Sequence, residues 1–223
     1  GKAIAAGGRI IEDNKKIAKY VNSPETNFFK KGNNLYNLNK ARKISNKYDE
    51  VYLVEGYMDV IKLYNNQILN CVANLGTALT NKQILLLGQF FSEIIICFDG
   101  DESGYKAALR AAENSLKYLQ PEKQISFLFL PDGEDPDSFV EDRGKEFFLN
   151  YSNENKLQIH KFIFNHYFNI SKKTPTDLAM LEKKLSRLAN SIADEFVKKY
   201  ILGFFLDKLS NLFPSNTCLL YTS

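Results

Sequence analysis

Short apolar runs alternate with helical patterns over the first two thirds of the chain. The runs are rich in β-branched or aromatic residues, which is typical of strands, and they occupy residues 50–55, 70–75, 94–98 and 125–130. The segments between them space their apolar residues as helices do and cover about 57–66, 80–91 and 102–118, with Thr80 as the N-cap of the second. This alternation predicts a compact α/β fold with a mostly parallel sheet and helices on both faces.

The pattern becomes helical throughout after about residue 136. The runs FVEDRGKEFFLNY and LQIHKFIFNHYF and the stretch 175–210 place apolar residues at helical spacing. Thr174 or Thr176 would cap the last of these, with Pro175 near its first turn. The tail SNTCLLYTS matches no element, and we expect it to be disordered or foreign to the native protein. Because the chain begins at Gly1 in the middle of a pattern, we expect it to be a fragment.

The composition argues against a membrane protein and against a zinc site. No apolar run approaches the roughly 18 residues that a membrane span needs, and no signal-peptide core follows Lys2. His160 and His166 are six positions apart and do not share a helix face, so no zinc is expected in this fragment. The three cysteines have no CxxC spacing and are expected to be reduced, as in a cytoplasmic protein; they are Cys71, Cys97 and Cys218.

Charge is distributed unevenly although the net charge is only +3. Residues 1–49 have a balance of +7, residues 50–150 one of −8 and residues 151–223 one of +4. A basic flank beside an acidic centre suits an enzyme that handles nucleic acid, because cations bind phosphates and carboxylates bind metal. For the last third we favour the simpler interpretation that lysines solvate helices.

Three of the predicted strands end abruptly in glycine and acidic residues. The six carboxylates that follow them are Glu55 and Asp59, Asp99 and Asp101, and Asp135 and Asp137. Because the carboxyl ends of parallel strands meet at one edge of a sheet, we expect these side chains to converge there. Clustered like charges repel one another, and a hard divalent cation with oxygen ligands, Mg²⁺ or Mn²⁺, relieves that repulsion. The sequence therefore predicts a metal-dependent phosphoryl-transfer site.

Each acidic motif also has a structural interpretation. Glu55 at a strand end is otherwise an exposed or N-capping acid, and Asp99-Gly100 is otherwise a tight turn. A helical pattern rather than a returning strand follows Asp101, which argues against a hairpin there. The loop at 131–137 is otherwise a solvated acidic loop, but it also follows an apolar strand of the same sheet.

The segment Asn22-Ser23-Pro24-Glu25-Thr26 is rich in turn residues and flanked by positive charge. The flanking candidates are Lys19, Tyr20, Lys30 and Lys31. Lysines and a tyrosine beside short polar residues suit contact with a template backbone or a triphosphate. Gly7-Gly8-Arg9 would let the backbone approach a phosphate closely.

The chain resembles bacterial DnaG-type primases. EGYMDV, LGTALT, FDGDESGYKAALRA and FLPDGEDPD, in this order and spacing, resemble the Toprim catalytic centre of that family. GGRII, AKYVNSPET, FFKKG and LYNL resemble the segment that precedes it. The likeness covers about 1–148 closely and the helical remainder loosely. NSPET together with LPDGEDPD is typical of primases among Toprim proteins, which also include topoisomerases, recombination mediators and nucleases.

The resemblance implies a division of the chain. Residues 1–49 would end a basic N-terminal subdomain, 50–148 would form the Toprim catalytic domain, 149–214 a truncated helical subdomain, and 215–223 the tail.

The resemblance also implies site roles. The six carboxylates map onto the family's metal-binding cluster, with Glu55, Asp99 and Asp101 as catalytic residues and Glu55 either a ligand or a general base. Arg9, Lys19, Tyr20 and Lys31 map onto residues that contact template and nucleotide, and the local composition adds Asn22 and Lys30.

The implied activity is the synthesis of short RNA primers on single-stranded DNA with Mg²⁺ or Mn²⁺. A 3′-hydroxyl would attack the α-phosphate of a ribonucleoside triphosphate, and pyrophosphate would leave. The implied partners are the template, the triphosphates, a replicative helicase through a region outside this chain, and a single-strand-binding protein, all at the replication fork in the cytoplasm.

Two rival functions remain open. Another Toprim enzyme would cleave DNA, and a topoisomerase would need a nucleophilic tyrosine, for which Tyr57 and Tyr105 are the nearest candidates. A non-catalytic nucleic-acid-binding module with a structural metal is the second.

Overall fold

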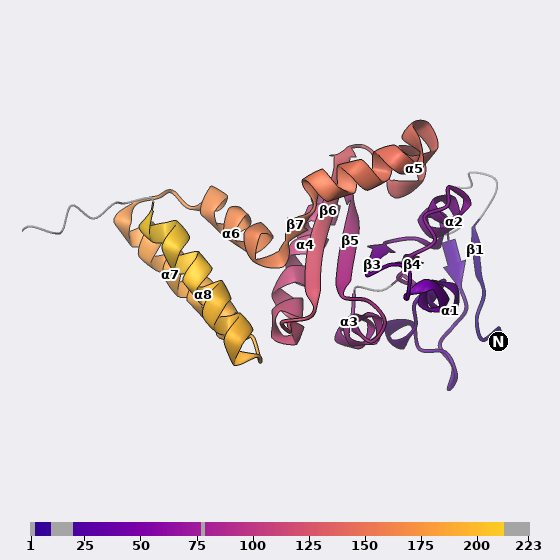
Figure 1. Ribbon diagram of the computed structural model, residues 1–223, viewed down its shortest axis with the longest axis horizontal. Helices are drawn as coiled ribbons and strands as arrows, with labels where there is room; N and C mark the ends of the chain where they lie inside the picture. The colour runs from indigo at the N-terminus through magenta and orange to yellow at the C-terminus, as the bar shows by residue number, and fades with distance from the viewer. Residues whose placement is uncertain (1–2, 10–19, 77–78, 212–223) are drawn as a thin grey trace, which may run out of the picture.

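A five-stranded sheet lies at the centre of the computed structural model, which describes residues 3–9, 20–76 and 79–211. The strand order is β4-β3-β5-β6-β7. Four strands run parallel: β3 (Glu50–Val54), β4 (Cys71–Ala73), β5 (Glu93–Gly100) and β6 (Gln124–Asp132). The short β7 (Leu157–Gln158) pairs antiparallel with β6 (Figure 1). The predicted α/β fold with a mostly parallel sheet is confirmed.

Helices cover both faces of this sheet. On one face pack α2 (Tyr57–Asn65) and α5 (Pro136–Asn155), and on the other α3 (Asn81–Gly88), α4 (Glu102–Ser115) and α6 (Ile159–Ile170). Successive strand residues point to opposite faces, so a sheet covered twice needs apolar residues at nearly every strand position. In β3, Tyr52 and Val54 belong to the first face and Val51 and Leu53 to the second, and all four are buried.

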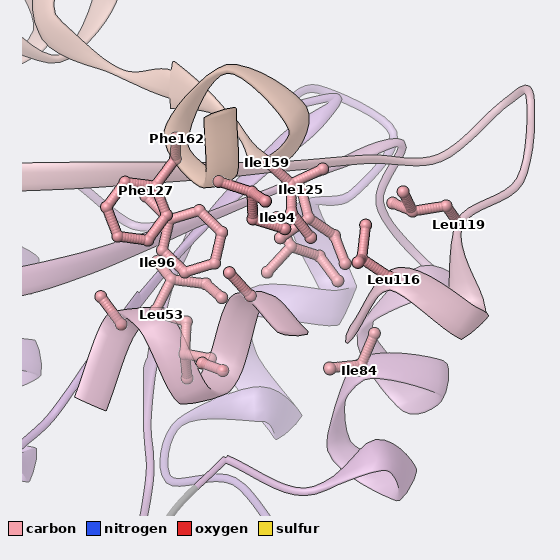
Figure 2. Close-up of a cluster of buried hydrophobic side chains, with 14 of the residues drawn as sticks. Leu53, Ile84, Ile94, Ile96, Leu116, Leu119, Ile125, Phe127, Ile159 and Phe162 are labelled. Atoms are coloured by element: carbon pink, nitrogen blue, oxygen red, sulfur yellow. The ribbon is translucent and has the colours of Figure 1, made fainter. Parts of the chain in front are cut away.

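The larger core joins the sheet to the helical part of the chain. Side chains from β3, β5 and β6 meet side chains from α3, from the 3-10 turn η3 (Leu116–Tyr118) and from α6 (Figure 2). The labelled members are Leu53, Ile84, Ile94, Ile96, Leu116, Leu119, Ile125, Phe127, Ile159 and Phe162. Because side chains of α6 belong to this core, α6 is packed against the sheet and is not joined to it by the chain alone.

The predicted helical stretch 175–210 is two helices, α7 (Pro175–Ala189) and α8 (Glu195–Ser210), which lie side by side at one end of the molecule (Figure 1). Thr174 is the N-cap of α7, and its hydroxyl oxygen accepts the N–H of Asp177 at 3.2 Å. The break follows from short polar side chains that bond the local backbone. The Ser191 hydroxyl donates to the Leu188 carbonyl at 2.7 Å, and Asp194 accepts the N–H of Val197 at 2.9 Å.

The N-terminal segment was not predicted in detail. It contains an antiparallel pair, β1 (Gly7–Arg9) and β2 (Tyr20–Asn22), and three short helical turns, η1 (Lys31–Asn33), α1 (Leu38–Ala41) and η2 (Arg42–Ile44). Tyr36 ties this segment to the sheet, because its N–H donates to the carbonyl of Ala73 at 2.9 Å.

Other element boundaries differ from the predictions. β4 is shorter than the expected 70–75, α3 ends at Gly88, and Leu157 and Gln158 form β7 where a helix was expected. The edge of β6 offers unpaired backbone groups to those two residues, and this outweighs their helical pattern. Cys71 and Cys97 are buried free thiols, as expected, while Cys218 lies outside the described residues. Over the described ranges, no helix is long and apolar enough to cross a bilayer.

An ion network closes the amino edge of the sheet. Lys156, which follows α5, places its Nζ 2.8 Å from Glu93 and 3.3 Å from Glu50, and Ser126 donates to Glu93 at 2.6 Å. The three charged side chains are only 18–28% exposed. Lys156 therefore separates two partly buried carboxylates at the start of neighbouring strands.

Replacing Lys156 by Met should lower the free energy of unfolding by about 1–3 kcal/mol, because two partly buried carboxylates would face each other without a cation. Urea denaturation followed by circular dichroism measures this loss. Lys106→Met is the control: it breaks the exposed pair with Glu102 and should change stability by less than about 0.5 kcal/mol. Equal losses in the two variants would contradict the role given to Lys156.

Candidate active site

The six carboxylates predicted to form a site all lie at the carboxyl edge of β3, β5 and β6, which are neighbours in the sheet. Glu55 directly follows β3, and Asp59 lies in the first turn of α2. Asp99 is the residue before the last residue of β5. The remaining three begin the helices that follow β5 and β6: Asp101 caps α4, Asp135 caps α5, and Asp137 lies in the first turn of α5. The strand order thus brings three separate motifs to one edge.

Gly100 allows the two acidic loops to touch. The β5–β6 pairing continues past the regular ladder to Gly100 and Asp132, with an irregularity after Phe98. The N–H of Gly100 donates to the carbonyl of Glu134 at 3.2 Å. A Cβ at this position would lie 2.1 Å from the carbonyl oxygen of Pro131, a distance too short for two atoms that are not bonded. Any residue other than glycine would push the two loops apart.

Three of the carboxylates are oriented by backbone hydrogen bonds. Asp59 accepts the N–H of Gly56 at 2.9 Å, Asp101 that of Gly104 at 2.6 Å, and Asp135 that of Ser138 at 2.7 Å. Each bond uses one carboxylate oxygen at a helix N-terminus, as capping residues do. Capping had been considered only for Glu55, which is exposed and is not the N-cap of α2. The second oxygen of Asp59, Asp101 and Asp135 makes no hydrogen bond within the described residues.

Burial and mutual repulsion raise the pKa of the most enclosed members. Burial, and then the charges of Asp99, Asp135 and Asp137, raise the pKa of Asp59 to about 7, against the opposing effect of its bond to Gly56. The pKa of Glu55 is raised by desolvation first and then by Asp99 and Asp101, although its side chain reaches solvent. These shifts show that carboxylates from three strands act on one another.

The pKa of Asp99 is raised by burial first and then by Asp135 and Asp101. The ion pairs identified between described residues include none to Glu55, Asp59, Asp99, Asp101 or Asp135. Asp137 is the exception, since Lys62 lies 3.5 Å away while also pairing with Glu141 at 2.7 Å. The edge therefore carries negative charge that the described protein does not neutralise.

This donor set has the chemistry that a hard divalent cation prefers, because it offers carboxylate oxygens with uncompensated charge. In this conformation, however, no three histidine, cysteine or acidic side chains of residues 3–9, 20–76 and 79–211 are close enough to share one ion. The exposed side chains of Glu55, Asp101 and Asp135 would have to turn inward to do so. The structure brings the predicted ligands to one edge without closing them around one point.

Arg143 holds the acidic loop between β6 and α5, and no motif in the sequence indicates this role. Its two terminal nitrogens lie 2.5 and 2.9 Å from the two oxygens of Glu134. Its guanidinium also stacks on the ring of Phe139, 4.5 Å from the centroid. The next residue, Gly144, has a positive φ of 79° that interrupts α5. Glu134 and Arg143 are nine positions apart, so no helical or strand spacing links them in the sequence.

Asn22 is brought to this edge from the N-terminal segment. A Cβ at Gly7 would lie 2.9 Å from the Asn22 amide oxygen and 3.1 Å from the ring of Tyr57, the residue that opens α2. A Cβ at Gly76, which follows β4, would lie 3.3 Å from the Asn22 amide nitrogen. The two glycines therefore leave room for Asn22 between the hairpin and the loop after β4.

The turn that carries Lys30 and Lys31 is fastened to α3. The Thr80 hydroxyl donates to the carbonyl of Gly32 at 2.5 Å, and the amide of Gln83 donates to the carbonyls of Lys31 and Asn34 at 3.1 and 2.9 Å. Because α3 starts where β4 ends, its N-terminus lies at the carboxyl edge. Thr80 was predicted as the N-cap of this helix, and it forms a capping box with Gln83. The sequence did not predict that the same two side chains also bind the turn at 31–34.

The remaining predicted contacts are placed only in part. Arg9 pairs with Tyr20 across the β1–β2 ladder. Lys30 lies 3.8 Å from Glu25. Lys19 and the side chain of Tyr20 lie outside the described residues.

Comparisons with known proteins agree with this arrangement. Residues 49–129 match the Toprim domain model, and residues 1–42 match the model of the DNA primase catalytic core, N-terminal domain. The DNA primase of Pasteurella multocida is 46% identical over 164 residues, which are 74% of this chain and 28% of that protein. The chain spans 22–36% of the length of the curated relatives it matches.

Two solved structures extend the likeness to nearly the whole chain. A DnaG primase catalytic domain bound to single-stranded DNA superposes with a TM-score of 0.85 at 36% identity, covering 95% of this chain and 66% of that one. The DnaG catalytic core superposes with a TM-score of 0.88 at 37% identity, covering 96% of this chain and 69% of that one. With this identity over more than two thirds of a DnaG catalytic core, the chain belongs to the bacterial DnaG-type DNA primase family.

Proposed function

We propose that this chain is part of a primase catalytic core that makes short RNA primers on single-stranded DNA by metal-dependent nucleotidyl transfer. The observation that carries the proposal is the convergence of six carboxylates at the ends of three neighbouring strands, where Lys62 is the one cation that an ion pair between described residues supplies. The family supports it, because a related catalytic domain was solved with single-stranded DNA bound.

Mg²⁺ or Mn²⁺ is the cofactor that this edge suits best, and Toprim domains generally bind divalent metal. The ligands we propose are Asp99, Asp101, Asp135 and Asp137, with Asp59 as a supporting acid and Glu55 as a further ligand or a base. When bound, the metal would supply a positive charge that offsets negative charge developing on the transferred phosphoryl group.

The chain's own residues would then position the reactants. The raised pKa of Glu55, caused mainly by desolvation, makes its exposed carboxylate a stronger base than a free one, suited to accept the proton of a 3′-hydroxyl. Asn22 lies within reach of the loop after β4 and would orient a nucleotide there. The other proposed contacts with template and triphosphate are Arg9, Lys19, Tyr20, Lys30 and Lys31.

The proposed partners are those that membership of the primase family implies. The substrates would be a single-stranded DNA template and ribonucleoside triphosphates, at the replication fork. A replicative helicase and a single-strand-binding protein would be partners of the longer protein. Of the two tyrosines that a topoisomerase could use, Tyr105 packs on Phe162, and burial raises its pKa, which lowers the fraction of the nucleophilic phenolate.

Ribonucleotide incorporation on single-stranded DNA with Mg²⁺ or Mn²⁺ tests the proposal. Asp99→Asn should reduce RNA product on the order of 100-fold, because the variant loses a charge at the reacting phosphate. The control is Asp207→Asn, which removes an exposed charge on α8 and should leave the product unchanged. DNA cleavage in place of RNA synthesis, or equal product from the two variants, would count against this function.

The stability of the metal-free chain should depend on pH through Asp59. Its folded-state pKa of about 7 lies above the ordinary value of 3.8, so its contribution is fully present below pH 3.8 and is lost as the pH rises through 7. The slope contributed by this one proton is at most about 1.4 kcal/mol per pH unit.

Chemical denaturation in EDTA between pH 5 and 8 measures this dependence. Asp59→Asn keeps an acceptor for Gly56 but cannot ionise, so it should flatten the profile. Added Mg²⁺ should stabilise the wild-type chain more at pH 8 than at pH 5, because protons compete with the metal. An unchanged slope in the variant would assign the pH dependence to other groups.

Arg143 is proposed to position the acidic loop for metal. Arg143→Ala should weaken Mn²⁺ binding about 10-fold, as the loss of residues that orient metal ligands commonly does. Isothermal titration with Mn²⁺ gives the affinity directly, without reliance on activity. Lys145→Ala is the matched control, since it removes a neighbouring positive charge that makes no ion pair with a described residue. If both substitutions weaken binding equally, the effect is one of net charge and not of loop position.

A further inference from the structure

Phe28 is the most exposed large hydrophobic side chain among the described residues, at 85%. It lies between the turn-rich segment that starts at Asn22 and the lysines at positions 30 and 31. At this exposure the ring packs little against the described part of the chain. A partner with a flat, apolar face would remove this ring from water, which is energetically favourable.

The backbone around Phe28 is fixed on both sides. The hydroxyl oxygen of Thr26 accepts the N–H of Phe28 at 3.2 Å and that of Phe29 at 3.0 Å, and the N–H of Thr26 donates to the carbonyl of Phe29 at 2.8 Å. Phe29 is buried, at 3% exposure. Because Phe29 anchors the turn inward, its neighbour must point outward, and the ring of Phe28 is presented on a rigid support.

This support stands at the carboxyl edge of the sheet. The residues just after Phe28 form η1, which packs against α3 (Figure 1). The clamp from Thr80 and Gln83 binds the carbonyls of Lys31 and Gly32 to the N-terminal turn of α3. The turn that follows the ring is thus fastened to the N-terminal end of α3, which follows β4 at the carboxyl edge of the sheet.

The charge next to the ring is positive. Lys31 makes no ion pair with any described residue, and Lys30 reaches Glu25 only at 3.8 Å with half of its side chain exposed. An exposed aromatic ring with adjacent ammonium groups is the combination by which proteins bind single-stranded nucleic acid, with bases on the ring and phosphates on the cations. A purely apolar protein surface would leave the two lysines unpaired, whereas a single nucleic-acid strand offers bases to the ring and phosphates to the lysines.

We infer that Phe28 is a stacking platform for an unpaired nucleobase, with Lys30 and Lys31 holding the adjacent phosphates. This inference rests on the proposed function, because it names a contact with the single-stranded template that the function requires. The inference adds an aromatic contact with the base to the charged contacts with phosphate. Stacking on Phe28 would not depend on the base sequence, since each base has a π-face.

The absence of tryptophan from the sequence makes a direct test simple. Phe28→Trp introduces the only indole, and stacking on a base should quench its fluorescence by about half when an oligothymidylate of about 16 nucleotides is added. An abasic oligonucleotide of the same length and charge should not quench it. Phe196→Trp, at a position 72% exposed on α8, is the control and should respond to neither.

Affinity measured by fluorescence anisotropy of the labelled oligonucleotide completes the test. Phe28→Ala should weaken binding of the oligothymidylate about 5- to 100-fold and leave binding of the abasic strand unchanged. Phe28→Leu should behave like the alanine variant, because it keeps the apolar character and loses the ring.

The outcomes separate this inference from the proposed function. If the wild-type chain binds the oligonucleotide and Phe28→Ala binds it equally well, the stacking role is wrong and the function stands. If the wild-type chain binds no single strand at all, the proposed function fails as well. If the indole of Phe28→Trp changes with protein concentration and not with DNA, the ring is a contact between copies of the chain, and the stacking role is again wrong.

Discussion

Repulsion among the carboxylates at the edge of β3, β5 and β6 is the constraint that the neighbouring structure has to withstand. Burial and three other acids hold the pKa of Asp59 near 7, so part of the folding free energy opposes this arrangement. The elements around it act as restraints: helix N-termini fix Asp101 and Asp135, and Gly100 allows two acidic loops to be bonded together. The acids stay in place because backbone N–H groups donate hydrogen bonds to the carboxylates, which restrains the side chains against their mutual repulsion.

The two edges of the same sheet handle negative charge in opposite ways. At the amino edge, Glu50 and Glu93 begin neighbouring strands and share Lys156 as a cation from the same chain. At the carboxyl edge, Glu55 and Asp99 end the same two strands and have no described cation. Within residues 3–9, 20–76 and 79–211, the amino edge thus has a lysine between its two carboxylates, and no identified ion pair neutralises Glu55 or Asp99 at the carboxyl edge. This contrast is independent of any relative and supports a metal at that edge.

Patterns that repeat locally were predictable, and contacts between distant segments were not. Alternating apolar strands and helices led to the parallel sheet, and acids at three strand ends led to the six residues of the edge. Thr80 could be named as a helix cap, but its bond to Gly32 depends on a turn 48 positions earlier in the chain. The pairing of Arg143 with Glu134 depends on a break at Gly144 that a helical pattern conceals. β7 depends on an open edge of β6, which is a property of the sheet and not of Leu157 and Gln158.

The clamp between α3 and the N-terminal turn has a consequence for how the chain would work. Gln83 is fully buried and bonds two carbonyls of that turn, so α3 and the turn move as one body. The same helix packs on β5, the strand that carries Asp99. A nucleic-acid strand held by Phe28 and the lysines would therefore be held at a fixed distance from the acidic edge. Transfer between two phosphates requires such a distance, because a misplacement of about 1 Å can cost on the order of 100-fold in rate. Buried polar bonds between the turn and α3 meet this requirement better than a flexible basic arm, which would bind the strand without aligning it.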